Sequence, residues 1–165
     1  MVNRRTLLGT AAAGGTVAAI AAAFGMRTLE AAPGAFEVTK TDAEWKRILT
    51  PQQHYVLREH GTERAGTSPL DGEKRKGTFH CAGCDLALYS SATKYDSGTG
   101  WPSFWQPLPK AIGTSQDNTL FTTRTEVHCR RCGGHLGHVF DDGPAPTGKR
   151  YCMNGVAMTF KAAVA

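Results

Sequence analysis

The arrangement of the cysteines constrains this chain of 165 residues more than any other feature. Four of its five cysteines form two pairs, Cys81 with Cys84 and Cys129 with Cys132, each with two residues between the cysteines. The two pairs are separated by 44 residues. Two such pairs can direct four thiolates at one ion, and a closed tetrahedral site of this kind is structural because no coordination position stays open. The spacing therefore predicts a structural zinc site that joins two distant parts of the chain.

Two other interpretations of these four cysteines stay open at the level of sequence. An exported protein could join them as two disulfides. Cysteines at this spacing also occur as redox motifs, but the strand–helix–strand pattern that accompanies thioredoxin-like motifs does not surround them. Four soft thiolates select zinc or iron over hard cations.

The first 32 residues differ in composition from the rest of the chain. Arg4 and Arg5 precede an uncharged stretch, residues 6–26, that is rich in alanine and glycine. This pattern predicts an export signal, and residues 3–8 resemble the twin-arginine motif of proteins that are exported after folding. The alternative is a membrane anchor, because ~20 apolar residues can span a bilayer. Alanine and glycine make a weak span, which favours the signal.

The sequence is thus divided into a signal segment, residues 1–32, and a functional domain, residues 33–165. We expect an exported, periplasmic protein without a membrane span in its mature form, unless the signal is retained as a tether. The formal charge of +5 falls to +3 in the domain, because the signal segment carries three arginines and one glutamate. Residues 74–76 form the only lysine and arginine cluster that remains. No nucleic-acid partner is expected, since such partners need an extended basic surface.

Two short helices are predicted at the start of the domain, followed by a mainly β region. Thr41 and Glu44 form a capping box ahead of a helical pattern, and Thr50 with Pro51 offers a second helix start. Gly61 is expected to end the second helix. Beyond it the apolar segments are short and separated by turn-forming residues, which predicts strands. We expect strands at residues 78–81, 85–89, 120–127, 138–141 and 155–161.

Cys152 is left over from the two pairs. A lone cysteine is most often buried and inert, so its neighbours decide its interpretation. Arg150 favours the thiolate form, and on an extended strand it would share one face with Cys152 and Asn154. His135 and His138 come shortly before. Either could bind a metal or serve structure alone, but two histidines and a cysteine in one small domain favour nucleophilic chemistry with acid–base support.

Three aromatic residues follow a glycine-rich loop at residues 100–105. Core packing is the default explanation for such a cluster. The loop position of Trp101, directly after a glycine, also suits an aromatic wall for a small apolar group of a substrate.

Taken together, these motifs resemble the methionine-R-sulfoxide reductases of the B type. The likeness extends over about residues 40–160. One of the motifs alone would be modest evidence, but the ordered set is highly specific. It is carried by residues 61–64, 80–84, 94–104, 129–140 and 150–154.

The resemblance implies a mainly β fold, with two antiparallel sheets in a sandwich-like or barrel-like domain, short N-terminal helices and one structural zinc ion. It implies reduction of the R epimer of methionine sulfoxide in proteins or peptides, and hence the repair of oxidised proteins. Cys152 matches the nucleophile, which becomes a sulfenic acid, and Trp101 matches the residue that receives the substrate methyl group. The residues that match polar groups around the sulfoxide oxygen are His135, His138 and Asn154. Phe140 and Arg150 are expected to bind substrate, and the implied zinc ligands are Cys81, Cys84, Cys129 and Cys132.

The sequence departs from the family at four positions. Thr99 stands where many members carry a second, recycling cysteine. We therefore expect an external thiol, such as a thioredoxin-like protein, to resolve the sulfenic acid. Gly66 replaces a common aromatic residue, and Met153 and Gly155 replace the commoner isoleucine and serine. These three changes bear on packing and on substrate preference.

Two classes of protein compete with this interpretation. A non-catalytic zinc ribbon usually has ~15–20 residues between its cysteine pairs and needs no fifth cysteine. A zinc deaminase needs an open metal site and an H-x-E motif with P-C-x-x-C, and the sequence contains neither motif.

Overall fold

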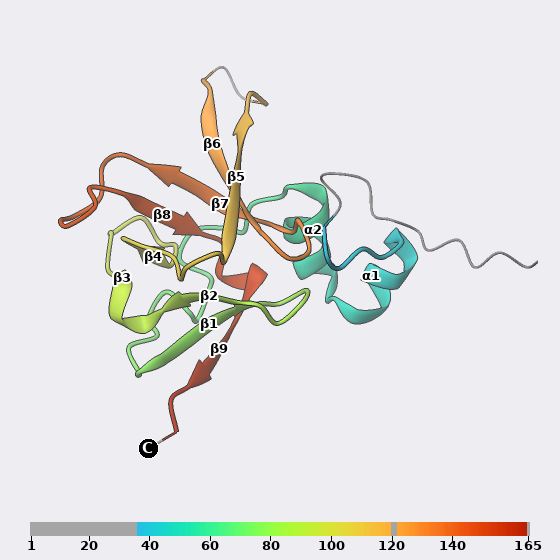
Figure 1. Ribbon diagram of the computed structural model, residues 1–165, viewed down its shortest axis with the longest axis horizontal. Coiled ribbons are helices and arrows are strands. Elements are labelled where there is room, and N and C mark those ends of the chain that lie inside the picture. The colour runs from blue at the N-terminus through green and yellow to red at the C-terminus, as the bar shows by residue number, and fades with distance from the viewer. Residues whose placement is uncertain (1–35, 120–121, 165) are drawn as a thin grey trace, which may run out of the picture. The chain divides into compact units, whose positions relative to one another are not determined.

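The computed structural model describes residues 36–119 and 122–164 (Figure 1). The expected signal segment, residues 1–32, and the first two residues of the strand expected at 120–127 lie outside the described residues. Within the described ranges, no helix has the length and apolar character needed to cross a membrane.

Two short helices begin where the capping boxes predict. They are α1, Asp42–Ile48, and α2, Pro51–Glu59. In α1 the Thr41 hydroxyl accepts a hydrogen bond from the Glu44 N–H, and the Glu44 carboxylate accepts one from the Thr41 N–H in return. These reciprocal bonds satisfy N–H groups that a helix start otherwise leaves without partners. The sequence prediction of both helix starts is confirmed.

The end of α2 lies one residue earlier than expected. His60, and not Gly61, adopts the left-handed conformation, with φ of 56°. Gly61 then donates its N–H to the Tyr55 carbonyl at 2.9 Å. A Cβ atom on Gly61 would lie 2.3 Å from the Tyr55 ring, so the glycine is required for close approach and not for its backbone angle.

The rest of the described chain forms two antiparallel sheets, as the resemblance implies. The strands are β1 Gly77–Cys81, β2 Ala87–Ser90, β3 Lys94–Tyr95, β4 Ser103–Phe104, β5 Ile112–Asp117, β6 Arg124–Cys129, β7 His135–Phe140, β8 Arg150–Met153 and β9 Met158–Ala162. The smaller sheet has the order β2-β1-β9, and the larger has the order β3-β4-β8-β7-β6-β5 (Figure 1). Two single 3-10 turns, Ser91–Thr93 and Gly155–Ala157, complete the elements. The larger sheet carries His135 and His138 on β7 and Cys152 on β8.

Aromatic side chains join the two sheets. The Phe79 ring of β1 and the Tyr89 ring of β2 lie 5.0 Å and 4.3 Å from the Phe104 ring of β4. The Tyr89 hydroxyl also donates to the Met153 sulfur of β8 at 3.2 Å. All four side chains are fully buried, and aromatic residues supply most of the apolar area of such a core. The core therefore fixes β8, which carries Cys152, and β4, which pairs with β8.

Candidate active site and metal centre

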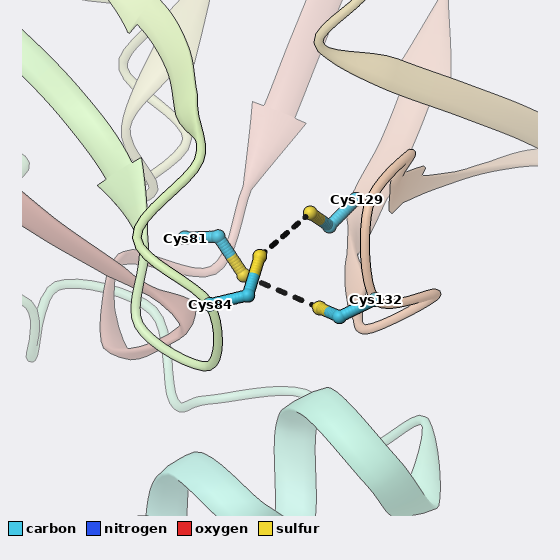
Figure 2. Close-up of side chains that lie close together, drawn as sticks. All are labelled: Cys81, Cys84, Cys129 and Cys132. Atoms are coloured by element: carbon cyan, nitrogen blue, oxygen red, sulfur yellow. Dashed lines mark hydrogen bonds between the residues drawn. The ribbon is translucent and has the colours of Figure 1, made fainter. Parts of the chain in front are cut away.

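The four paired cysteines converge, as their spacing predicts (Figure 2). The Cys81 sulfur lies 3.7 Å from that of Cys132, and the Cys84 sulfur lies 3.5 Å from that of Cys129. A disulfide needs about 2.05 Å between sulfurs. Four thiolates around one zinc ion, each at about 2.3 Å, would stand about 3.8 Å apart. The observed distances exclude disulfides here and fit a four-thiolate metal centre. We call these four residues the cysteine clamp.

The two halves of the clamp use the same backbone turn. In each half a strand ends at the first cysteine, Cys81 in β1 and Cys129 in β6. The residue four positions later donates its N–H to that cysteine's carbonyl at 2.8 Å, from Asp85 in one turn and Gly133 in the other. Both of these residues have left-handed backbone angles, with φ of 60° and 68°. The matching turns bring both cysteines of each pair to the same side.

The close packing of the four thiols separates their pKa values. Hydrogen bonds from Cys132, Cys81 and Cys84 lower the pKa of the Cys129 thiol. Hydrogen bonding to Cys129 raises the pKa of the Cys81 thiol. All four sulfurs can be thiolates at once only if a cation balances their charge. The donor set therefore fits a divalent, thiophilic ion.

Side chains of the N-terminal helices cover the clamp. Trp45 of α1 and Leu57 of α2 are buried, and both lie beside the Cys81–Cys84 turn. The guanidinium of Arg58 donates to the Cys132 carbonyl at 3.0 Å and stacks over the Trp45 ring. Three of the four cysteines are buried and Cys84 is partly buried, which fits a role in holding the fold together.

Cys152 lies in a different environment, in the middle of the larger sheet. On β8 it stands opposite Ser103 of β4 and opposite His138 of β7. It is half-buried at a cavity of about 340 Å³, a size that suits one substrate side chain better than a large cofactor. Six of the seven residues predicted to act on substrate line this cavity: Trp101, His138, Phe140, Arg150, Cys152 and Asn154. The remainder of the wall is Thr62, Thr99, Arg124 and Gly137.

A larger hollow, of about 690 Å³, lies elsewhere on the described surface. Its wall, which includes Gln52, Arg64 and Phe160, contains no cysteine or histidine. Chemistry therefore selects the smaller cavity as the candidate active site.

A glycine allows the strands beside Cys152 to approach each other. Gly137 on β7 has φ of 156°, and a Cβ atom there would lie 2.1 Å from the Cys152 carbonyl oxygen. Any larger residue would push β7 away from β8. His138 would then move away from the cysteine sulfur.

His138 is held by an acidic partner that the sequence did not identify. Its Nε2 lies 2.7 Å from a carboxylate oxygen of Asp117 on β5. Hydrogen bonds from Thr119, and then from His138 and Arg124, hold the pKa of the Asp117 carboxyl well below its usual range. Because a carboxylate must accept from Nε2–H, the other ring nitrogen, Nδ1, is the one that can serve a substrate.

His135, predicted to surround the substrate oxygen, is not among the cavity-lining residues. Its side chain is almost fully buried, and its Nδ1 lies 2.7 Å from Glu126 of β6. Burial lowers the pKa of His135 and favours the neutral ring. Burial also acts to raise the pKa of Glu126, but hydrogen bonds from Ser115 and His135 outweigh it, and the net pKa is lowered. His135 lies behind His138, with their ring centroids 5.4 Å apart.

Glu63 organises the opposite wall through its backbone. Its carbonyl accepts a hydrogen bond from the Trp101 indole N–H at 3.1 Å, and its N–H donates to the Asn154 side-chain oxygen at 2.9 Å. The carboxylate accepts the backbone N–H groups of Gly155 and Val156. Burial raises the pKa of Glu63, and these two hydrogen bonds offset only part of that rise. The Asn154 amide also donates to a backbone carbonyl, so this residue is firmly oriented.

Arg150 and Phe140 form the rim of the cavity together. They stand opposite each other on β8 and β7, and the guanidinium lies 4.4 Å from the Phe140 ring centroid. Asp142 accepts two hydrogen bonds from Arg150, at 2.9 Å and 2.8 Å. This bidentate pair fixes the plane of the guanidinium over the ring.

Thr99 links Cys152 to a chain of hydroxyl groups. The Thr99 hydroxyl lies 3.9 Å from the Cys152 sulfur and 2.8 Å from the Ser97 hydroxyl. Ser97 in turn lies 2.7 Å from the buried Ser103 hydroxyl. Each hydroxyl can donate once and still accept, so the chain can hydrogen-bond sulfur as a thiol or as a thiolate.

The other positions that depart from the family pattern do not line the cavity. Gly66 has φ of 74° and donates its N–H to the Gly100 carbonyl, directly before Trp101. Met153 is buried in the core between the sheets. A Cβ atom on Gly155 would collide with the Ser68 side chain. These three residues lie close to residues that line the cavity, but they are not part of its wall.

One family model and three relatives show what this chain is similar to. The family model of the SelR domain matches residues 49–162. The peptide methionine sulfoxide reductase MsrB of Agrobacterium fabrum is 52% identical over 126 residues, which cover 76% of this chain and 93% of that protein. The enzyme of the same name from Methanosarcina barkeri is 53% identical over 125 residues, covering 75% and 88%. That from Leptospira interrogans is 51% identical over 127 residues, covering 76% and 97%.

Proposed function

The chain belongs to the SelR family of B-type peptide methionine sulfoxide reductases, and we propose that it uses Cys152 to reduce the R epimer of methionine sulfoxide in proteins and peptides. As a peptide-methionine (R)-S-oxide reductase, it repairs oxidised methionine. The observation that carries the catalytic assignment is the position of Cys152: it is the one cysteine outside the clamp, and it faces a cavity of one-side-chain size.

In the first step, the Cys152 thiolate attacks the sulfoxide sulfur. The net change transfers the oxygen atom, so that sulfoxide and thiol become methionine and a Cys152 sulfenic acid. The substrate sulfur is reduced by two electrons and the cysteine sulfur is oxidised by two. Thr99 supports this step, because its hydroxyl can donate to the thiolate before the attack.

The sulfoxide oxygen must be hydrogen-bonded or protonated before its bond to sulfur can break. His138 is the proposed acid, since it stands opposite Cys152 and its Nε2 is bonded to Asp117. The Asp117 carboxylate accepts from Nε2–H and orients the ring, so that a proton on Nδ1 can be donated to the oxygen. Asn154 is proposed to donate from the remaining N–H of its amide. His135 supports His138 from behind and does not contact substrate.

Trp101 and Phe140 are proposed to select the substrate group and its stereochemistry. An indole wall favours the substrate methyl group, and exchange of methyl and oxygen would place a polar atom against that wall. The indole is held at its N–H by Glu63, so it cannot turn to accept the other epimer. Arg150 is proposed to hold the substrate backbone at the rim.

An external thiol is proposed to regenerate the enzyme. Attack on the sulfenic acid releases water and forms a mixed disulfide, and a second thiol of the reductant then frees Cys152. Thr99 cannot perform this step, and the other four cysteines lie in the clamp. A thioredoxin-like protein, with two thiols close together, matches this need.

The cysteine clamp is proposed to hold one zinc ion. Zinc fits because four thiolates at these separations form a closed tetrahedral site without redox chemistry. It would supply no step of the reaction. Bound zinc joins the end of β1 to the end of β6, and so fixes the two sheets relative to each other.

Export is proposed from the sequence of residues 1–32. The paired arginines and the apolar stretch that follows them support a twin-arginine route to the periplasm, in which zinc is loaded before transport. The mass of the protein isolated from its host tests this proposal. A mass that lacks the first 20–32 residues supports cleavage, and a full-length mass in the membrane fraction would show a retained tether.

A single-turnover experiment tests the proposed chemistry. The reduced chain is mixed with excess methionine-sulfoxide peptide without any reductant, and dimedone is added to trap sulfenic acid. We expect one methionine per chain and one dimedone adduct, located on Cys152 by peptide mass mapping. Turnover with the adduct elsewhere, or no turnover by protein that holds its metal, contradicts the proposal.

A further inference from the structure

We propose that His60, Glu126 and His135 form a second metal site, which binds a transition-metal ion such as Zn²⁺ reversibly. The candidate ligand atoms are one nitrogen of each imidazole and one carboxylate oxygen, and they lie within 4.8 Å of one another. They come from three separate elements: the residue that ends α2, strand β6 and strand β7. We call these three residues the histidine site. It shares no residue with the cysteine clamp.

The distances within the histidine site fit an ion. A single oxygen of Glu126 lies 2.7 Å from the His135 Nδ1 and 3.0 Å from the His60 Nδ1. Zinc at 2.0–2.2 Å from such ligands requires them to stand about 3.3 Å apart in a tetrahedron. The ligands must therefore spread slightly. His60 can make this change, because its side chain is 63% exposed at the end of a helix.

The donor set determines which ions the site can take. Two imidazole nitrogens and one carboxylate oxygen are the ligands of zinc sites that keep an open position for water. Magnesium and calcium prefer oxygen ligands alone, and are not expected to bind. Ser115 donates a hydrogen bond to the other Glu126 oxygen and thereby orients the carboxylate from outside the site.

The exposure of the three side chains distinguishes the histidine site from the clamp. His135 is 3% exposed and Glu126 is 11% exposed, whereas His60 opens to solvent. An ion can therefore enter and leave on the His60 side without unfolding the chain. The site has three protein ligands in place of four, and only one of them is anionic, whereas the clamp offers four thiolates, so it binds more weakly than the clamp.

The histidine site adjoins the cavity through His135. The ring of His135 lies 5.4 Å from that of His138, the residue opposite Cys152. An ion on the His135 Nδ1 would add positive charge beside the proposed acid. Slower reduction at raised zinc concentration would follow, and this consequence rests on the proposed function. The binding of the ion does not.

Calorimetric titration with Zn²⁺ tests the proposal. The titration uses the Cys152→Ser chain with one zinc already in the clamp, so that no free thiol competes. We expect one further equivalent of zinc to bind. His60→Asn in the same background should weaken it at least tenfold, because one ligand is lost. Asparagine tolerates the left-handed angle of residue 60, so the helix end is preserved.

The matched control is Glu59→Gln, which removes a neighbouring exposed carboxylate that is not a ligand. It should leave the affinity for the second zinc unchanged. Both variants must retain the first zinc, which shows that they fold. Absence of a second equivalent overturns the proposal, and so does a second equivalent that binds equally well to His60→Asn. Because neither measurement uses catalysis, a failed reductase assay and a failed metal site are distinguishable.

Discussion

The cysteine clamp and the cavity around Cys152 both place sulfur on strands, but their surroundings differ in kind. In the clamp, the sulfurs face one another beside Trp45 and Leu57, and Arg58 holds the Cys132 carbonyl. In the cavity, one half-buried sulfur faces residues whose polar groups are held from outside, as Asp117 holds His138. The number and arrangement of the sulfurs, more than their chemistry, distinguish the proposed structural role of the clamp from the proposed reactive role of Cys152.

The cavity and the clamp also differ in the acidic residues around them. Near the cavity, His138 contacts Asp117, His135 contacts Glu126 and Arg150 contacts Asp142. Arg124 of the cavity wall shares Asp117 with His138. The four cysteines of the clamp lie within reach of one another instead, and the proposed cation would be shared among them. Four substitutions test this contrast, from the largest expected effect to the smallest.

Replacing the reactive sulfur should abolish catalysis and leave the fold intact. We expect Cys152→Ser to lose reductase activity by about 10⁴-fold or more, because a hydroxyl is a far weaker nucleophile toward sulfur. Its free energy of unfolding should stay within about 1 kcal/mol of wild type, since the sulfur is half-buried and the change is small. A steady-state assay and urea unfolding measure the two effects. Retained activity would assign the chemistry to another residue.

Replacing a clamp sulfur should have the reverse effect. Cys132→Ser should lose the metal and destabilise the fold by more than about 4 kcal/mol, because a buried ligand of a closed site is lost. The ratio of zinc to protein and the urea midpoint report the change. Cys152→Ser, which should keep its metal, serves as the control. A Cys132→Ser chain that keeps both metal and stability would show that the clamp is not structural.

Adding a second sulfur to the cavity should change how the enzyme is regenerated. The Thr99 hydroxyl is 3.9 Å from the Cys152 sulfur, so Thr99→Cys places two thiols within reach of each other. After a single turnover, this variant should contain an internal disulfide, where wild type contains a sulfenic acid. Mass spectrometry distinguishes the products, and Thr99→Ser is the control for altered packing. A sulfenic acid that persists in Thr99→Cys would refute the proposed geometry.

The smallest expected effect concerns the buried carboxylate behind the cavity. Burial raises the pKa of Glu63 in the folded chain. A raised pKa stabilises the fold most below the unfolded pKa, and this contribution is lost as pH rises through the folded pKa. Glu63→Gln cannot titrate. The wild-type free energy of unfolding should therefore fall relative to this variant over the pH range that begins at the ordinary glutamate pKa of 4.5 and rises from there. A difference that is constant across this range would show that burial of Glu63 does not perturb its ionisation.

Local sequence signals predicted a large part of the molecule. The capping box at Thr41 and the helix start at Thr50 and Pro51 predicted both helices, because the hydrogen bonds of a cap form between residues within four positions of each other. The two-residue spacing within each cysteine pair predicted the clamp, although the approach of the two pairs spans 44 residues and depends on the fold. The alternation of residues on a strand predicted that Arg150, Cys152 and Asn154 share one face, and all three line the cavity.

Features that depend on how the strands pair could not be predicted in this way. Strand β5 was missed because residues 112–117 are mostly polar and exposed and show no apolar alternation. The same strand supplies Asp117, so the partner of His138 was missed with it. His135 was expected at the substrate, but its bond to Glu126 on β6 holds it behind the wall. Only the sheet register brings these residues together.

The most direct test of the central claim follows both epimers of the substrate. The chain is incubated with dithiothreitol and a peptide that carries an equal mixture of R and S methionine sulfoxide, and each epimer is quantified by chromatography. We predict that the R form disappears with an equal gain of methionine, that the S form remains, and that Cys152→Ser consumes neither. Consumption of the S form, or of either form by Cys152→Ser, would contradict the account.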